Sequence, residues 1–382
     1  MYGNPLMDLK KAGQSVWIDY LSRDMLRSGE LGRLINEDGL CGVTSNPTIF
    51  QKAIEGSGLY DEELLSMIHD GKLDQRELFL GLAVEDIKAA ADVLLPVYES
   101  TGGRDGYVSL EVSPTLANDT HATVEEALEL YTMVGRKNLM IKVPATKAGI
   151  PAIERLTSLG LNVNVTLLFS VKRYEEAAHA YLRGLDDRSR MGLPLDRVNS
   201  VASFFVSRVD TLVDKMLDDM LKKTGSTEGA KSVKELRGKS AVANARLAYR
   251  SFREITSSTS CLALEEKGAH YQRLLWGSTG TKDPAYSDVK YVEELVGPDT
   301  VNTMPEDTIK AFRDHGKAEV TIDKDMDEAE EVFAGLASMG IDMENAAAWL
   351  EKDGVGKFTA SYLDLLEKTA IKRDAFLKGK AA

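Results

Sequence analysis

Eight short apolar or alternating segments recur along the 382-residue chain, each followed by a polar turn and an amphipathic stretch. Segments rich in Val, Ile, Leu and Phe between turn residues predict strands, whereas apolar residues spaced three and four apart predict helices, as in residues 85–100 and 123–137. Strands that alternate with helices form a parallel sheet, either doubly wound or closed, and eight strands favour the closed (β/α)8 or TIM barrel. The predicted strands are residues 15–21, 40–46, 107–114, 138–144, 162–170, 200–207, 273–280 and 299–304.

Two segments exceed the minimal barrel plan. Residues 209–257 indicate a helical insertion of two helices around a Gly/Ser-rich loop. From about Asp323 onward the pattern indicates two or three further helices, which either stabilise the outside of the barrel or cover its mouth. Because no linker marks a second unit, residues 1–382 are predicted to form a single barrel domain.

Composition narrows the classes of partner. The formal net charge of −13 argues against nucleic acid and anionic membranes, although a few inward-pointing cations could still bind phosphorylated substrates. Neither a membrane-length apolar run nor a signal-peptide pattern occurs, so we expect a cytoplasmic protein. The two cysteines and five histidines lack metal-ligand spacing, which predicts no metal site, and Cys41 is expected in the core.

Polar residues occupy one parity of several predicted strands. Asn162, Asn164 and Thr166 alternate with apolar residues on one strand, and Glu111 and Lys142 occupy similar positions on two others. Because successive side chains point to opposite faces, these groups should share the barrel interior, where burial costs several kcal/mol unless each finds a partner. Polar interiors toward strand C-termini are where barrel active sites lie. Asp19, on the strand predicted at 15–21, and Thr44 and Asn46, on that at 40–46, likewise lie on the opposite strand face from apolar neighbours and should face the same interior.

Lys142 is the most informative position, because it is flanked by Ile141 and Val143 within a predicted central strand. A structural lysine would bury its stem and send its ammonium to solvent or to a carboxylate. A central strand gives little room for that, and burial disfavours the charged ammonium. A neutral amine attacks carbonyl groups. The pattern therefore favours Lys142 as a nucleophile.

The same segments resemble transaldolases, in their longer bacterial form, from about residue 14 to about residue 315. The matching stretches are WIDYLSRDM, GVTSNPTIF, SLEVSPTLANDT, LMIKVPATKAGIPAIE, NVNVTLLFSVKRYEE, SFFVSRVD, LLWGSTGTK and DTVNTMP. The resemblance implies transfer of a dihydroxyacetone unit from sedoheptulose 7-phosphate or fructose 6-phosphate to glyceraldehyde 3-phosphate or erythrose 4-phosphate. It places the reaction in the non-oxidative pentose phosphate pathway, without a cofactor, in a monomer or homodimer.

The resemblance also implies roles for individual residues. Lys142 would form the Schiff base, Asp19 would be the base for carbon–carbon cleavage, and Glu111 with Thr166 would hold a water for proton transfers. The residues implied to bind the sugar hydroxyls are Thr44, Asn46, Asn164 and Ser203.

The phosphate end of the implied site departs from the family pattern. Arg208 matches the arginine that binds substrate phosphate, but Gly280 stands where many transaldolases have a second arginine. Ser278 is a candidate hydroxyl donor, and Lys282 is the candidate replacement cation. Phe205 and Glu111 match transaldolases rather than the much shorter fructose-6-phosphate aldolases, which release free dihydroxyacetone and are the alternative, as is a non-catalytic sugar-phosphate-binding barrel.

Several of these residues also have a structural interpretation. Asp19 could cap a helix, Asn46 before Pro47 could initiate a turn, and Glu111 could be an ion-pair partner of Lys142. Arg208 could form a surface salt bridge, Ser203 could fill space, and His121, near a strand end, is expected to be structural.

Overall fold

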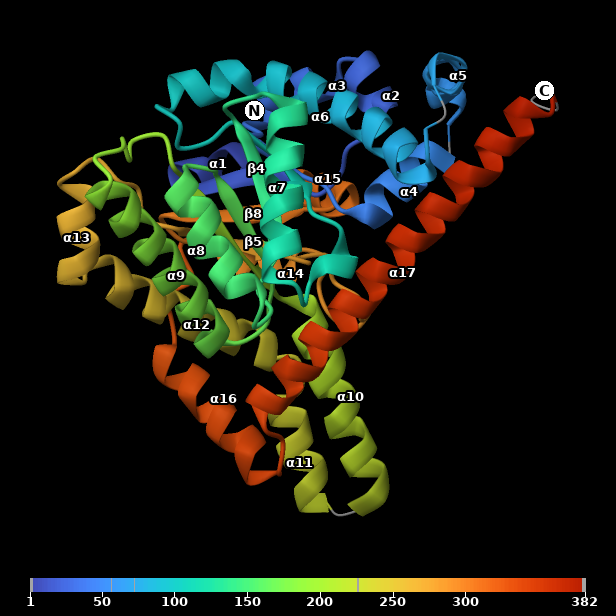
Figure 1. The fold of residues 1–382 in the computed structure, drawn as a ribbon. Coiled ribbons are helices and arrows are strands. Elements are labelled where there is room, and N and C mark those ends of the chain that lie inside the picture. Colours follow the sequence, from blue (N-terminus) through green and yellow to red (C-terminus); the bar gives the residue numbers. More distant parts are fainter. Residues whose placement is uncertain (1–2, 56, 72, 225–226, 380–382) are drawn as a thin grey trace.

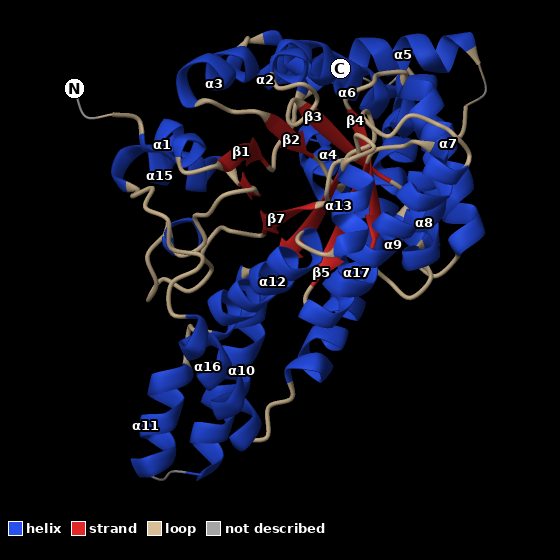
Figure 2. Cartoon of the chain, turned by 90° about the vertical axis from the view of Figure 1, so that its left-hand side faces the viewer, coloured by secondary structure: helices blue, strands red, loops and turns tan. Residues whose placement is uncertain are grey.

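The computed structural model describes residues 3–55, 57–71, 73–224 and 227–379. Eight parallel strands close into a barrel in sequence order, so the predicted TIM-barrel fold is confirmed. Figure 2 shows the strands in the middle of the molecule with helices around them. The strands are β1 (Gln14–Ile18), β2 (Gly42–Thr44), β3 (Tyr107–Glu111), β4 (Leu139–Pro144), β5 (Val163–Leu168), β6 (Ser200–Phe205), β7 (Arg273–Gly277) and β8 (Thr300–Met304).

Most predicted strands run two or three residues past the observed C-terminal ends. The apolar residues just beyond these ends, such as Leu21, Val112 and Phe169, stay buried although their backbone has left the sheet. An apolar pattern reports burial rather than sheet pairing, so it overestimates strand length at the ends that carry polar side chains.

Below the C-terminal ends of the strands, a layer of apolar side chains fills the barrel interior and is called the plug here. It is formed by the inward side chains Trp17, Cys41, Tyr107, Met140, Val201, Leu275 and Val301. Gly42 is required here, because a Cβ at this position would lie 2.3 Å from the indole ring of Trp17. The plug separates the polar side chains at the C-terminal ends of the strands from a second buried polar cluster at the N-terminal end, in which Arg273 pairs with Asp105 at 3.0 Å and donates to Ser15 at 2.8 Å.

The helices of the first half of the chain surround the barrel. Their bounds are α1 (Pro5–Lys11), α2 (Arg23–Arg27), α3 (Glu30–Asp38), α4 (Pro47–Glu55), α5 (Asp61–Asp70), α6 (Gln75–Ser100), α7 (Thr120–Val134), α8 (Gly149–Leu159) and α9 (Val171–Arg190), with short 3-10 turns η1 (Gly58–Tyr60) and η2 (Pro114–Leu116).

The segment expected to hold two helices around a loop contains three. The helices here are α10 (Ser207–Thr224), α11 (Thr227–Leu236) and α12 (Ser240–Thr256). The extra helix α11 packs against α10 and α16, which supplies the apolar contact that its Gly- and Ser-containing sequence alone does not indicate. The chain continues with α13 (Thr259–Glu265), α14 (Lys290–Glu293) and α15 (Glu306–His315).

Two helices form the C-terminal extension, α16 (Met326–Ser338) and the 35-residue α17 (Met343–Leu377). The first packs against α12 on the outside, whereas α17 runs beside α4 and α10 (Figure 1). The buried residues of α17 recur at three- and four-residue spacing and include Gly354, Phe358 and Tyr362. Phe358 lines the central cavity, so α17 covers part of the barrel mouth. In the part of the chain that the structure describes, no helix has the length and apolar character needed to cross a membrane.

Candidate active site

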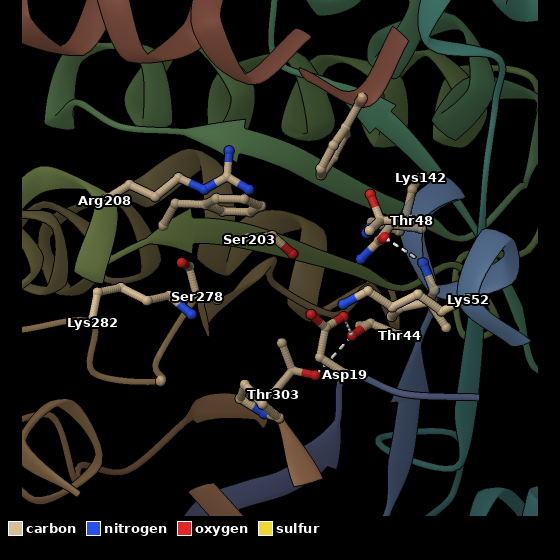
Figure 3. A pocket seen from close by; sticks show the side chains of 17 residues that line it. Asp19, Thr44, Thr48, Lys52, Lys142, Ser203, Arg208, Ser278, Lys282 and Thr303 are labelled. Atoms are coloured by element: carbon tan, nitrogen blue, oxygen red, sulfur yellow. Dashed lines mark hydrogen bonds between the residues drawn. The ribbon is translucent and has the colours of Figure 1, made fainter. Parts of the chain in front are cut away.

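A cavity of about 300 Å³ opens at the C-terminal ends of the strands (Figure 3). It brings together nine of the twelve predicted site residues, and the remaining three, Glu111, Asn164 and Thr166, are not part of its lining. The predicted residues that line it are Asp19, Thr44, Asn46, Lys142, Ser203, Phe205, Arg208, Ser278 and Lys282.

Lys142 lies at the inner end of the cavity on β4. Its residue is only 4% exposed, and the Nζ atom donates a hydrogen bond to the backbone carbonyl of Ser45 at 2.9 Å. The register of the sheet places Glu111 on one side of Lys142 and Asn164 on the other. Its nitrogen therefore faces the cavity from a buried strand and has no route along its own stem to the protein surface.

Glu111 is the nearest carboxylate to Lys142. Oε2 lies 3.5 Å from Nζ, and the Glu111 side chain is 2% exposed. Burial raises the pKa of Glu111 above the ordinary glutamate range, although the positive charge of Lys142 opposes that rise. The structural interpretation as an ion-pair partner is thus compatible with a chemical role, because the same contact allows a proton to pass between the two groups.

Thr166, on the other side of β4, shares an unusual feature with Glu111. The Thr166 hydroxyl and both carboxylate oxygens of Glu111 are buried without a hydrogen-bond partner among the residues described. Leu167, which follows, has a φ of 60°, and the pairing of β5 with β6 shifts register between Val165 and Leu168. Unpaired buried polar atoms and a left-handed backbone are both costly, and such costs concentrate at functional sites.

Asp19 follows β1 directly and points into the cavity. Its Oδ1 accepts a hydrogen bond from Thr44 at 2.6 Å, and the Thr44 and Thr303 hydroxyls lie 2.8 Å apart. The helix-capping interpretation is wrong, because the side chain that caps α2 is Ser22, which accepts from the backbone of Met25. The carboxylate is therefore held by a threonine pair and faces the same space as Lys142.

Asn46 combines both interpretations considered for it. Its Oδ1 accepts from the backbone N–H of Ile49 at 3.1 Å, at the start of α4, and the residue also lines the cavity. Asn164 lies deeper and is fully buried, with its amide donating to Ser109 at 3.0 Å and its oxygen accepting from Ser203 at 2.6 Å. The Ser203 hydroxyl is thus fixed by Asn164 and is more than a space filler.

Arg208, Ser278 and Lys282 lie at the opposite end of the cavity from Lys142 (Figure 3). Arg208 is the second residue of α10 and is not a surface residue, and burial of its guanidinium lowers the pKa of that group. Ser278 has a φ of 55°, and its hydroxyl lies 3.0 Å from that of Ser207. A Cβ on Gly280 would lie 3.9 Å from Nζ of Lys282, so the Lys282 ammonium occupies space beside a glycine that a larger side chain would fill.

Some lining residues were not predicted from the sequence. They are Thr48, Ile49 and Lys52 of α4, Thr303 and Pro305 at the end of β8, Phe358 of α17, and the glycines 277 and 280. Alternation within residues 299–304 places Thr303 on the parity of Val301 and could have revealed it. No local signal distinguishes Lys52 or Phe358 from other helix residues. His121 is 84% exposed beside Glu125 and does not line the cavity.

Comparison with known proteins agrees with this geometry. Residues 16–369 match the family model described as transaldolase/fructose-6-phosphate aldolase. The chain is 47% identical over 374 residues to a transaldolase of Mycobacterium tuberculosis, with 97% of this chain and 98% of the relative covered. It is 44% identical over 368 residues to a transaldolase of Trichodesmium erythraeum, covering 96% and 97%, and 47% identical over 379 residues to transaldolase 2 of Streptomyces coelicolor, covering 98% and 99%.

Proposed function

Because the chain belongs to the transaldolase/fructose-6-phosphate aldolase family, we propose that it transfers a dihydroxyacetone unit between sugar phosphates through a Schiff base on Lys142. The enzyme is a transferase of the transaldolase type. The roles of individual residues are part of the proposal. The observation that supports them most directly is the buried amine of Lys142, 3.5 Å from a carboxylate, at the end of a cavity whose other end carries Arg208 and Lys282.

The first step is formation of the imine. The neutral amine of Lys142 attacks the C2 carbonyl of a ketose phosphate, and the carbinolamine then loses water to give an iminium ion. Each stage needs a proton delivered or removed at nitrogen or oxygen. Glu111 lies within reach of the nitrogen, and a water held between its carboxylate and the Thr166 hydroxyl would satisfy both groups while carrying those protons.

The second step is cleavage of the C3–C4 bond. Asp19 removes the proton from the C4 hydroxyl, the bond electrons move into the iminium, and an aldose phosphate leaves while an enamine stays on Lys142. An acceptor aldose phosphate then reacts in reverse order: the enamine carbon attacks its aldehyde and Asp19 returns the proton. Thr44 holds the carboxylate of Asp19 in place for both directions.

The remaining polar groups bind the substrate. Asn46 and Ser203 line the cavity beside Lys142 and would hydrogen-bond the hydroxyls of the three-carbon unit, with Asn164 orienting Ser203 from behind. Arg208, Ser278 and Lys282 would bind the phosphate, which also lies near the N-terminus of α10, where the helix dipole favours an anion. Cytoplasmic location and a monomer or homodimer stay predictions from the sequence.

Acceptor-dependent turnover tests the proposed reaction. With fructose 6-phosphate alone, we expect little release of free dihydroxyacetone, whereas adding erythrose 4-phosphate should give sedoheptulose 7-phosphate and glyceraldehyde 3-phosphate at full rate. The physical reason is that the enamine waits in a site covered by α17 until an aldehyde enters. The measurement is a coupled assay for dihydroxyacetone with and without acceptor. Rapid release without acceptor would assign the chain the fructose-6-phosphate aldolase activity instead.

Replacing Glu111 tests the proton relay through its pH dependence. As pH falls through the raised pKa of Glu111, the carboxylate takes up a proton and can no longer accept one from Lys142. The acid limb of kcat/KM should therefore lie above the ordinary glutamate range. In Glu111→Gln that inflection should disappear and the rate should fall roughly 10²-fold. The matched control is Glu125→Gln, a 68% exposed glutamate on α7, which should keep both rate and profile. An unchanged acid limb in Glu111→Gln would exclude this role.

A further inference from the structure

Two aromatic rings from distant parts of the chain lie close to the guanidinium of Arg208. Its Cζ atom is 5.2 Å from the ring centroid of Phe205, on β6, and 5.7 Å from that of Phe358, on α17. Phe358 is 5% exposed and lines the cavity. A residue of the C-terminal helix therefore forms one wall around the guanidinium that faces the substrate.

The environment of Arg208 leaves its charge without a direct counterion. Among the residues that the structure describes, no carboxylate lies within ion-pair distance of Arg208, and its NH1 atom is buried without a hydrogen-bond partner. An aromatic face attracts a cation through its quadrupole, but it does not accept strong hydrogen bonds from the N–H groups of the guanidinium. The rings thus hold the guanidinium in place while its donors stay available for an anion, whereas a carboxylate partner would compete with that anion.

The geometry points to Phe358 as a positioning residue that makes α17 part of the substrate-phosphate site. This inference rests on the proposed role of Arg208 in binding phosphate. It extends that role by assigning the C-terminal helix a contribution to affinity for phosphorylated sugars, beyond covering the mouth of the barrel.

Gly354, one turn before Phe358, supports this assignment. A Cβ at Gly354 would lie 2.9 Å from Cδ2 of Leu167 and 3.6 Å from NH1 of Arg208. The helix therefore approaches the arginine as closely as a glycine permits. Any larger residue would have to displace Leu167, whose backbone is already in the left-handed region, or push α17 and its phenylalanine away from the guanidinium.

The position of Phe358 is fixed on both sides along α17. Before it, Glu351 pairs with Arg173 of α9 at 3.3 Å. After it, Ser361 accepts a hydrogen bond from Thr48 of α4 at 3.0 Å, and the ring of Tyr362 packs edge-on against a phenylalanine of α6 at 6.0 Å. These contacts join α17 to three different helices of the barrel, so the ring is held over Arg208 by the fold and not by one local contact.

Steady-state kinetics with paired acceptors tests the inference. Glyceraldehyde 3-phosphate and D-glyceraldehyde differ only in the phosphate, so the ratio of their KM values reports phosphate binding. With saturating sedoheptulose 7-phosphate as donor, and release of erythrose 4-phosphate as the readout for both acceptors, Phe358→Leu should raise KM for the phosphorylated acceptor about tenfold, and that for D-glyceraldehyde by less than about twofold. Phe358→Tyr keeps the aromatic face and should restore the ratio. Trp349→Leu, on the same helix but 52% exposed, is the matched control and should change neither value.

Two further variants separate the possible failures. If Arg208→Met leaves the KM ratio unchanged, Arg208 does not bind phosphate, and both its proposed role and the assignment of Phe358 fail. If Arg208→Met changes the ratio but Phe358→Leu does not, the assignment of Phe358 is wrong and the proposed function stands. Equal losses with both acceptors in Phe358→Leu would indicate a purely structural role and overturn the inference. Should Phe358→Leu fail to fold, Gly354→Ala provides the same test and should shift the ratio in the same direction.

Discussion

Replacement of Lys142 by alanine is expected to abolish covalent trapping of substrate and to lower kcat/KM by on the order of 10⁴-fold or more. The amine of Lys142 lies beside Glu111 and donates to the backbone carbonyl of Ser45, on a side chain that lines the cavity. Without it no iminium forms, so neither carbon–carbon cleavage nor enamine transfer can begin. The measurement is borohydride reduction in the presence of fructose 6-phosphate, followed by intact-protein mass spectrometry and peptide mapping.

Lys147 provides the matched control, because it is an exposed lysine five residues further along the chain and does not line the cavity. Lys147→Ala should trap substrate as the unmodified enzyme does. An adduct that persists in Lys142→Ala, mapped to Lys52 or Lys282, would show that another cavity lysine is the nucleophile. An unmodified mass in the parent enzyme would contradict the Schiff-base reaction altogether.

The alternation of strands with helices predicted the barrel, and the parity of residues within the strands predicted which polar side chains are buried in its interior. Asn164, Thr166 and Lys142 could be recognised because polar residues on one parity of a buried strand have few structural explanations. The same rule misplaced Asn162, which ties neighbouring chain segments together through the backbone oxygens of Lys137 and Leu139 before β5 begins. Alternation therefore locates interior residues within a strand but fails at the positions just outside it.

The outer part of the site depends on contacts that no local pattern carries. Phe358 contacts Arg208, which lies 150 residues earlier in the sequence. The periodic apolar residues of its helix would look the same if that helix packed on the outside of the barrel instead of over its mouth. The same holds for Lys282, whose ammonium reaches back beside Gly280 through the path of its loop. Sequence periodicity predicts that a helix is amphipathic, whereas the partner of its apolar face is decided by packing of the whole chain.

Replacement of Asp19 by asparagine should separate imine formation from carbon–carbon cleavage. The asparagine can still interact with Thr44, which contacts the carboxylate at 2.6 Å, but it cannot take the proton from the C4 hydroxyl. Substrate should therefore still be trapped on Lys142 by borohydride, and the trapped adduct should keep the whole ketose phosphate instead of the three-carbon unit. Turnover should fall by about 10²- to 10⁴-fold.

The mass of the adduct distinguishes the two steps directly, since the intact sugar phosphate and the three-carbon fragment differ in mass. Asp24→Asn, an exposed aspartate in the first turn of α2, is the matched control and should give the three-carbon adduct at the normal rate. If Asp19→Asn trapped as poorly as Lys142→Ala, Asp19 would be needed for imine formation itself, and the division of proton transfers between Asp19 and Glu111 would be wrong. If it released the aldose normally, the base would lie elsewhere in the cavity, and the Thr44–Thr303 pair that holds Asp19 would have only a structural purpose.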